Sequence, residues 1–118
     1  MKNEYLCIKP MVIGPKGRQY SVWYGYNVIA SCISKDDAKK ILSLAKRTPY
    51  TFGEKVYLNV YEGSFSGIID DIIVIFSTGV HYLQFSVKLD NPHVIDGKMK
   101  NKYTAYDFQL STQLNLFA

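Results

Sequence analysis

A single stretch of the chain repeats its apolar residues at the spacing of an α-helix, and this pattern constrains the fold most strongly. The apolar residues at i, i+3, i+4 and i+7 are Ala38, Ile41, Leu42 and Ala45. Ser34 can cap the amino end, and Asp37, three residues later, resembles the second member of a capping box. Thr48-Pro49 ends the pattern, because a residue before proline is disfavoured in the α region. We predict one amphipathic helix over about residues 35–46.

Outside this stretch, apolar and polar residues alternate as they do in β-strands. The expected strands cover residues 4–13, 19–33, 56–61, 68–77, 80–89 and 103–114. The alternation is clearest in 80–89, where the residues expected to face the core are Leu83, Phe85, Val87 and Leu89. Elsewhere, we expect the even-numbered residues from Tyr20 to Ala30 to face the core, and the β-branched run Ile72–Phe76 to be buried on both faces.

The sequence also predicts the turns between these strands and the orientation of the last strand of the chain. Gly63-Ser64-Phe65-Ser66-Gly67 is expected to be a flexible turn, and Asn91-Pro92 to end a strand. Asp96-Gly97 can reverse the chain in a hairpin. In the last strand, the residues expected to point inward are Tyr106, Phe108 and Leu110.

The order β-β-α-β-β-β-β with short connections predicts an α+β fold. About six strands would form one twisted antiparallel sheet, with the amphipathic helix packed on a face. At 118 residues, 47% of them apolar and 20% charged, the chain is expected to fold throughout as a single domain, residues 1–118.

Neither a metal site nor a membrane segment is expected. Cys7 and Cys32 fall on separate expected strands without Cys-x-x-Cys spacing, which is typical of reduced packing residues. The start of the chain lacks the pattern of a secretion signal. The longest apolar run, Ile72–Phe76, is too short to cross a bilayer. We therefore predict a cytoplasmic protein without a cofactor.

The sequence contains no recognisable catalytic motif. Gly63–Gly67 has Phe65 where a hydrolase nucleophile elbow requires serine. His81 and His93 are the only histidines, and His81 is expected to be a strand-end residue with one ring nitrogen hydrogen-bonded. Four aspartates that could in principle surround a hard cation are Asp70, Asp71, Asp90 and Asp96. They are more typical of turns and strand ends, so we expect no enzyme.

Two basic turns carry part of the functional signal. The first contains Lys98, Lys100 and Lys102 beside Tyr103, and the second contains Lys16 and Arg18. Cations next to an aromatic ring suit a phosphodiester backbone with a stacked base. Lysine-rich turns also keep sheet edges from pairing with other chains, so a purely protective role is the alternative. The net charge of +4 favours acidic partners without requiring nucleic acid.

Outward-facing tyrosines carry the second part of the signal. The chain has ten tyrosines, and those expected on outer faces of strands are Tyr57, Tyr61, Tyr82 and Tyr103. Such rings offer apolar area and a hydrogen-bonding tip to a protein, a base or a second copy of the chain, so a homodimer is possible.

These two signals together favour a non-enzymatic binding protein. The leading hypothesis is an inhibitor or accessory protein of the phage or mobile-element type, which occludes a larger nucleic-acid-handling partner, either a protein or a protein–nucleic-acid complex. The phage comparison is an analogy of type. The alternative is a single-stranded nucleic-acid-binding domain using the same residues, and the third hypothesis is a hydrolase or nuclease.

Overall fold

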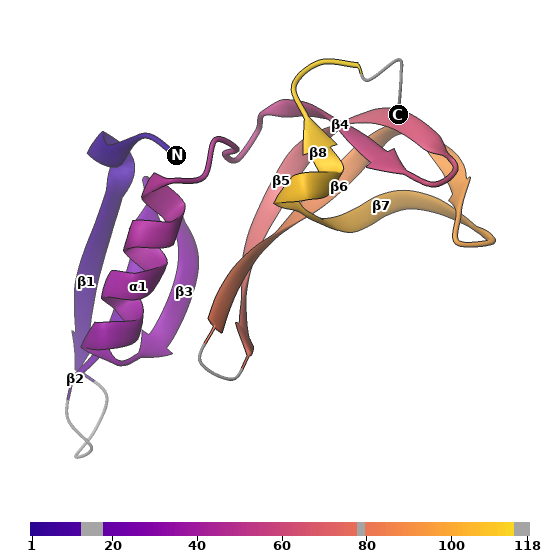
Figure 1. Cartoon of the computed structure of the whole chain (residues 1–118). Helices are drawn as coiled ribbons and strands as arrows, with labels where there is room; N and C mark the ends of the chain where they lie inside the picture. Colours follow the sequence, from indigo (N-terminus) through magenta and orange to yellow (C-terminus); the bar gives the residue numbers. More distant parts are fainter. Residues whose placement is uncertain (13–17, 78–79, 115–118) are drawn as a thin grey trace. The chain divides into compact units, whose positions relative to one another are not determined.

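The computed structural model in Figure 1 describes residues 1–12, 18–77 and 80–114. It divides into two compact units. Unit 1 comprises Met1–Pro49 and Ile73–Leu83, and unit 2 comprises Tyr50–Ile72 and Gln84–Ala118. Two long strands continue from one unit into the other, and the single domain expected from the sequence stays a prediction.

The fold is α+β, as the sequence predicted, but its strands form two antiparallel sheets rather than one. The elements are η1 (Asn3–Tyr5), β1 (Leu6–Val12), β2 (Arg18–Tyr24), β3 (Asn27–Ile33), α1 (Lys35–Lys46), β4 (Lys55–Val60), β5 (Gly63–Ser77), β6 (Val80–Ile95), β7 (Lys98–Tyr106), η3 (Asp107–Gln109) and β8 (Leu110–Ser111). The three-stranded sheet has the order β1-β2-β3, and the five-stranded sheet has the order β7-β6-β5-β4-β8.

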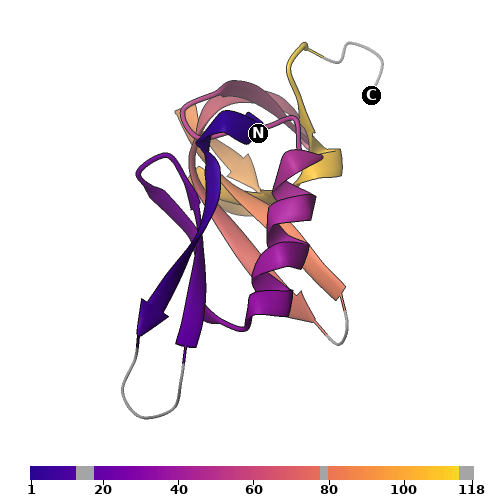
Figure 2. The same cartoon turned by 90° about the vertical axis from the view of Figure 1, so that its left-hand side faces the viewer.

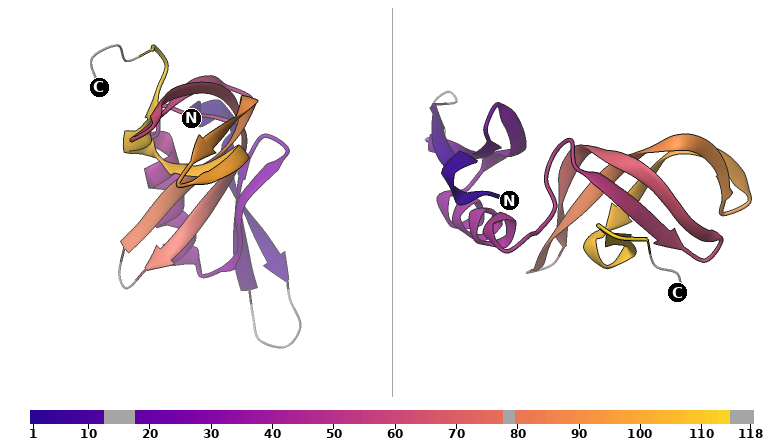
Figure 3. Two further views of the ribbon diagram at one scale, coloured as in Figure 1. Left: turned by 90° about the vertical axis from the view of Figure 1, so that its right-hand side faces the viewer. Right: turned by 90° about the horizontal axis from the view of Figure 1, so that it is seen from above.

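In unit 1, helix α1 packs on one face of the three-stranded sheet and contacts all three of its strands (Figures 2 and 3). Its predicted bounds and cap are confirmed, since the Asp37 amide donates to the Ser34 hydroxyl oxygen at 3.1 Å. The helix residues that are buried are Ala38, Ile41 and Ala45. Leu42, also expected in the apolar stripe, is only half-buried.

The single strand expected over 19–33 is wrong, because a hairpin turn interrupts it. Tyr24 pairs with Asn27, and Gly25 between them has a φ of 58°, the left-handed conformation that glycine adopts most easily. Glycine at the first central position is the requirement of a type II′ turn, which matches the twist of the strands it joins. The turn and two register shifts between β2 and β3 alter the alternation, so Tyr26 and Val28 are exposed while Ala30 is buried.

Unit 2 is a twisted antiparallel meander whose short last strand, β8, is added at the β4 edge. Strands β4 to β7 are sequential neighbours, and η3 leads to β8, which pairs with β4. The buried apolar residues of this unit are Val56, Leu58, Ile69, Ile72, Phe85, Val87, Leu89, Ile95, Ala105 and Leu110. The four β6 residues that were predicted to face the core are all buried, which confirms the prediction. Phe85, Val87 and Leu89 lie in this unit, and Leu83 is the last residue of unit 1. Asp96 and Gly97 form the predicted two-residue hairpin, both with positive φ.

Gly63–Gly67 is a strand segment rather than the expected flexible turn. It pairs residue by residue with β4, from Val60 opposite Gly63 to Val56 opposite Gly67. Gly67 is buried, and a Cβ there would lie 2.6 Å from the Lys88 carbonyl oxygen and 2.7 Å from Val87 Cγ1. Glycine is therefore needed for the close approach of β5 to β6, and the sequence pattern could not distinguish that need from a turn.

Three further expectations about strands are corrected by the structure. Asn91-Pro92 does not end its strand, because β6 continues to Ile95 through a register shift between Lys88 and His93. Within Ile72–Phe76 only Ile72 is buried, so the run is not covered on both faces. The expected last strand is divided between β7, η3 and β8. As a result, the side chains of Tyr106 and Phe108 are exposed and only Leu110 is buried.

Candidate interaction surfaces

The four tyrosines expected on outer faces are distributed over both units. Tyr57 lies on β4, Tyr61 is fully exposed in the β4–β5 turn, and Tyr103 lies on β7. Tyr82 is exposed on the part of β6 that belongs to unit 1. Strands β4 and β7 are separated by β5 and β6, and within the described ranges no ring–ring contact joins any two of these four side chains. A role for each in binding stays a prediction.

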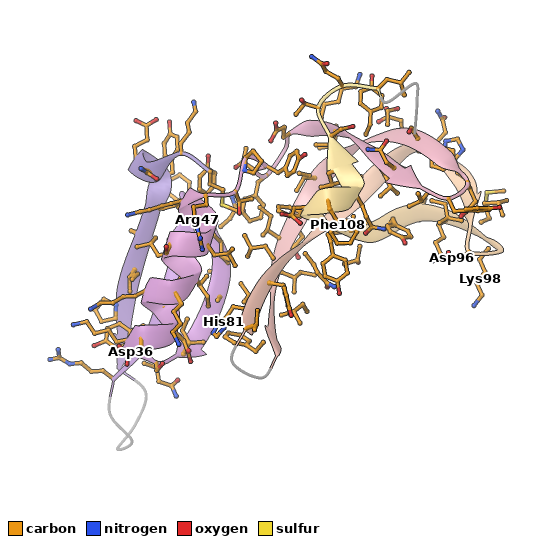
Figure 4. The ribbon with its side chains drawn as sticks, viewed as in Figure 1. Asp36, Arg47, His81, Asp96, Lys98 and Phe108 are labelled. Atoms are coloured by element: carbon orange, nitrogen blue, oxygen red, sulfur yellow. The ribbon has the colours of Figure 1, made fainter. Side chains whose placement is uncertain are left out.

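The lysines expected in a turn before the last strand lie instead within β7, an edge strand of the five-stranded sheet. They follow the Asp96-Gly97 turn directly, and Figure 4 shows Asp96 and Lys98 together at this end of the hairpin. Arg18 begins β2 in unit 1 and is exposed. Lys16 lies outside the described residues.

Two of the three β7 lysines are paired with carboxylates of their own chain. Lys102 Nζ lies 2.8 Å from Asp70 Oδ2, and this hydrogen bond raises the pKa of Lys102. Burial alone would raise the pKa of Asp70, but hydrogen bonds from Lys102 and Ser86 outweigh it and lower that pKa. Lys100 Nζ lies 3.6 Å from Asp96 Oδ2 and 5.3 Å from the centre of the Tyr103 ring. A phosphate group would have to compete with these internal partners.

The other candidate carboxylates have structural contacts as well. Asp71 accepts a hydrogen bond from the Ile72 amide at 2.9 Å, and Asp90 accepts one from the Ser66 hydroxyl at 2.6 Å. Among the described residues, no group of three or more histidine, cysteine, aspartate or glutamate side chains is arranged to hold a metal ion. Within the described ranges, the four aspartates considered as candidate cation ligands therefore form no such group.

His81 forms a contact that connects the β5–β6 hairpin to the helix within unit 1. Its Nε2 lies 3.2 Å from Asp37 Oδ1 in the first turn of α1, as expected for a strand-end histidine with one hydrogen-bonded nitrogen. The Phe76 ring packs edge-on against the His81 ring, with 4.9 Å between centroids. Phe76 and His81 therefore lie on the same face of the hairpin. The second histidine, His93, stacks on Phe65 in unit 2.

The opposite face of this hairpin end is an exposed apolar surface. Because side chains alternate along a strand, residues one or three positions away from Phe76 or His81 lie on the opposite face of the hairpin. These residues, which we call the hairpin patch, are Ile73, Ile75, Val80 and Tyr82. Ile73 is 37% exposed, Val80 48% and Tyr82 43%, while Ile75 is half-buried. The sequence predicted Tyr82 as an outward residue but placed the isoleucines in a buried strand.

A second exposed aromatic group lies in unit 2, where the sequence had predicted inward residues. The rings of Tyr106 and Phe108 stack with their centroids 5.6 Å apart and their planes 6° from parallel. The short η3 helix causes this arrangement, because it replaces strand alternation over three residues. No sequence signal marked it, except Asp107 as a residue that favours turns.

Comparisons with known proteins do not identify a relative. No protein-family model, no curated protein and no solved structure matches the chain. Within the described ranges, no helix has the length and apolar character needed to span a membrane.

Proposed function

We propose that this chain is a non-enzymatic protein-binding module that occludes a surface of a larger partner through the hairpin patch. The observation that supports the proposal is the exposure of Ile73, Val80 and Tyr82 on two paired strands, within ten residues of sequence and on the same face as half-buried Ile75. Contiguous exposed apolar groups of this kind are characteristic of interaction sites. Tyr82 is the expected anchor, because tyrosine is enriched among residues that dominate binding energy.

The reverse side of the hairpin favours a patch of fixed conformation. His81 contacts Asp37 of the helix, Phe76 packs on His81, and Leu83 is buried. A hairpin backbone held in this way loses little additional freedom when a partner binds to its other face, and such preorganisation increases affinity.

A partner that handles nucleic acid is part of the proposal because the net charge of +4 favours an acidic surface, such as the nucleic acid of a protein–nucleic-acid complex. Direct single-strand binding through β7 is the second candidate, supported by the exposed Lys98 next to the Lys100–Tyr103 contact. The ion pairs of Lys100 and Lys102 weigh against it, because each would be broken or shared when a phosphate binds.

The experiment is a capture assay in extracts of the organism of origin, followed by affinity measurement with the purified partner. We expect Tyr82→Ala and Val80→Asp to weaken binding by about 10-fold or more, the effect of losing over 1.4 kcal/mol at a binding hot spot. Tyr26→Ala is the matched control, since Tyr26 is 99% exposed in the turn between β2 and β3 and belongs to none of the candidate surfaces, so this variant should bind normally.

The competing candidate is tested on the same variants with a single-stranded oligonucleotide. If the three β7 lysines contact phosphates, the slope of log affinity against log salt is about −2, from roughly 0.7 per contact. The proposal would be wrong, and the competing candidate favoured, if the chain bound the oligonucleotide with this slope and captured no protein partner. In that case Val80→Asp should leave oligonucleotide binding unchanged.

A further inference from the structure

The exposed side of helix α1 carries the positive charge that the chain has in excess. The buried residues of the helix are Ala38, Ile41 and Ala45, and helical periodicity places its exposed residues on the other side. These residues, which we call the basic helix face, are Lys35, Asp36, Lys39, Lys40, Ser43, Lys46 and the C-cap residue Arg47. Figure 4 shows Asp36 and Arg47 near the two ends of the helix. The face holds five of the 14 basic residues of the chain and one of its 10 acidic residues, which leaves nine of each elsewhere.

The five cations of the basic helix face have no internal partners. Within the described ranges none of them forms an ion pair, and Asp36 does not pair with Lys40 despite their i, i+4 spacing. The lysines of β7 differ, because Lys100 and Lys102 are paired with aspartates of the same chain. A phosphate group that binds the helix would therefore displace no partner.

Helix stability does not explain this arrangement of charges. Lys35 is the first residue of α1, where the helix dipole disfavours a positive charge. Lys35 and Lys39 are also a like-charged pair at i, i+4, which destabilises a helix slightly. Of the five cations, only Lys46 and Arg47 lie at the carboxyl end that the dipole favours. Binding of an anionic ligand would account for residues that are kept at this cost.

The composition of the basic helix face fits duplex nucleic acid better than other anionic partners. Phosphates are contacted by arginine, lysine and hydroxyl side chains, which make up this face apart from Asp36. Protein interfaces are instead rich in aromatic residues and depleted in lysine, and single-strand sites add aromatic rings on which bases stack. A helix that lies in a membrane surface exposes its apolar side, whereas the apolar side of α1 is buried against the sheet.

We propose that the basic helix face binds the phosphate backbone of duplex nucleic acid, independently of its sequence. From Lys35 to Lys46 the helix rises about 16 Å, at roughly 1.5 Å per residue. A duplex presents about one phosphate charge per 1.7 Å of its axis, so roughly ten phosphates lie along that length. This inference goes beyond the proposed function, because it concerns a second surface with its own ligand and does not depend on the hairpin patch.

The test is a titration of a short fluorescein-labelled DNA duplex with the full chain, followed by fluorescence anisotropy at several salt concentrations. We expect a Kd of about 10⁻⁴ to 10⁻⁶ M near physiological salt, the usual range for sequence-independent binding. The slope of log affinity against log salt should be about −3 to −4.5, from roughly 0.9 per phosphate over three to five contacts. A duplex of unrelated sequence should bind equally well. Absence of binding at about 50 mM salt would overturn the proposal and leave this face as a solvated surface.

A matched pair of double variants locates the binding surface. Lys39→Gln with Lys46→Gln should weaken duplex binding by about 10-fold or more and reduce the size of the salt slope by about 2, with the helix retained by circular dichroism. Lys55→Gln with Lys88→Gln removes the same charge from exposed residues of unit 2 and should change affinity by less than about three-fold. Equal losses in the two double variants would mean that only net charge matters, and would refute the site.

A dT oligonucleotide distinguishes this surface from the lysines of β7. The duplex should bind more tightly than the single strand, and Lys98→Gln should leave duplex affinity unchanged. If the single strand binds more tightly, and loses affinity in Lys98→Gln but not in the helix variant, the nucleic-acid contacts belong to β7 and the proposal is wrong. Tyr82→Ala should leave duplex affinity unchanged, so failure of the hairpin patch and failure of the basic helix face give different results.

Discussion

Replacing Gly67 by alanine tests the structure at a point where the sequence pattern gave the opposite expectation. In a flexible turn, Gly→Ala stabilises a protein by about 0.4 to 1 kcal/mol, because the unfolded chain loses freedom. In the observed strand, the new methyl group would lie 2.6 Å from the Lys88 carbonyl oxygen and 3.2 Å from the Leu89 Cα. Both are backbone atoms of β6, so the clash cannot be relieved by a rotamer change alone.

We therefore expect Gly67→Ala to destabilise the protein by about 1 to 3 kcal/mol, the usual cost of overpacking a buried site. Urea denaturation followed by circular dichroism would show a lower midpoint with an unchanged slope. Ser66→Ala is the control, since it removes only an exposed hydrogen bond to Asp90 and should cost no more than about 1 kcal/mol. A Gly67→Ala protein as stable as the parent would refute the close approach of β5 and β6.

Two further predictions concern the helix and the paired carboxylate. Ile41 is fully buried, so Ile41→Ala should cost about 2 to 5 kcal/mol in the same denaturation assay, whereas Lys39→Ala on the exposed side should stay within about 0.5; equal small losses would mean that the helix is not docked. Lys102→Met should raise the pKa of Asp70, measured by carboxyl NMR shifts. Because the folded-state pKa of Asp70 is lowered, its stabilising contribution is present above the ordinary aspartate pKa and is lost as pH falls through the lowered value. An Asp70 pKa that does not change in the variant would contradict the ion pair.

The helix could be predicted because its determinants are local. Ser34, Asp37 and the apolar spacing that includes Ile41 lie within a few residues of one another, and capping and periodicity act at that range. The Asp96-Gly97 turn was predictable for the same reason, since its dipeptide satisfies the two positive φ angles by itself.

The strand arrangement was less predictable because it depends on partners far apart in sequence. Gly25 and Gly67 are both single glycines in strand-like segments, yet one turns the chain and the other admits a neighbouring backbone. Nothing local distinguishes these roles. The Gly25 hairpin makes β2 and β3 neighbours, and together with β1 they form the three-stranded sheet.

Surface predictions succeeded where alternation continued and failed where it was interrupted. Tyr82 is exposed because the regular alternation of β6 turns it away from buried Leu83. Phe108 was expected inside because the strand pattern was extended through η3, where a 3₁₀ turn changes the direction of each side chain. The lysines of β7 were recognised as a group, but their ion pairs with Asp70 and Asp96 depend on tertiary and turn geometry.

Hydrogen–deuterium exchange of the chain with and without its captured partner tests the central claim most directly. If the hairpin patch is the binding surface, amides of residues 73–76 and 80–83 should gain protection in the complex, while those of β7 exchange as in the free chain. Protection confined to β7, with the hairpin end unchanged, would contradict the proposed role of the patch.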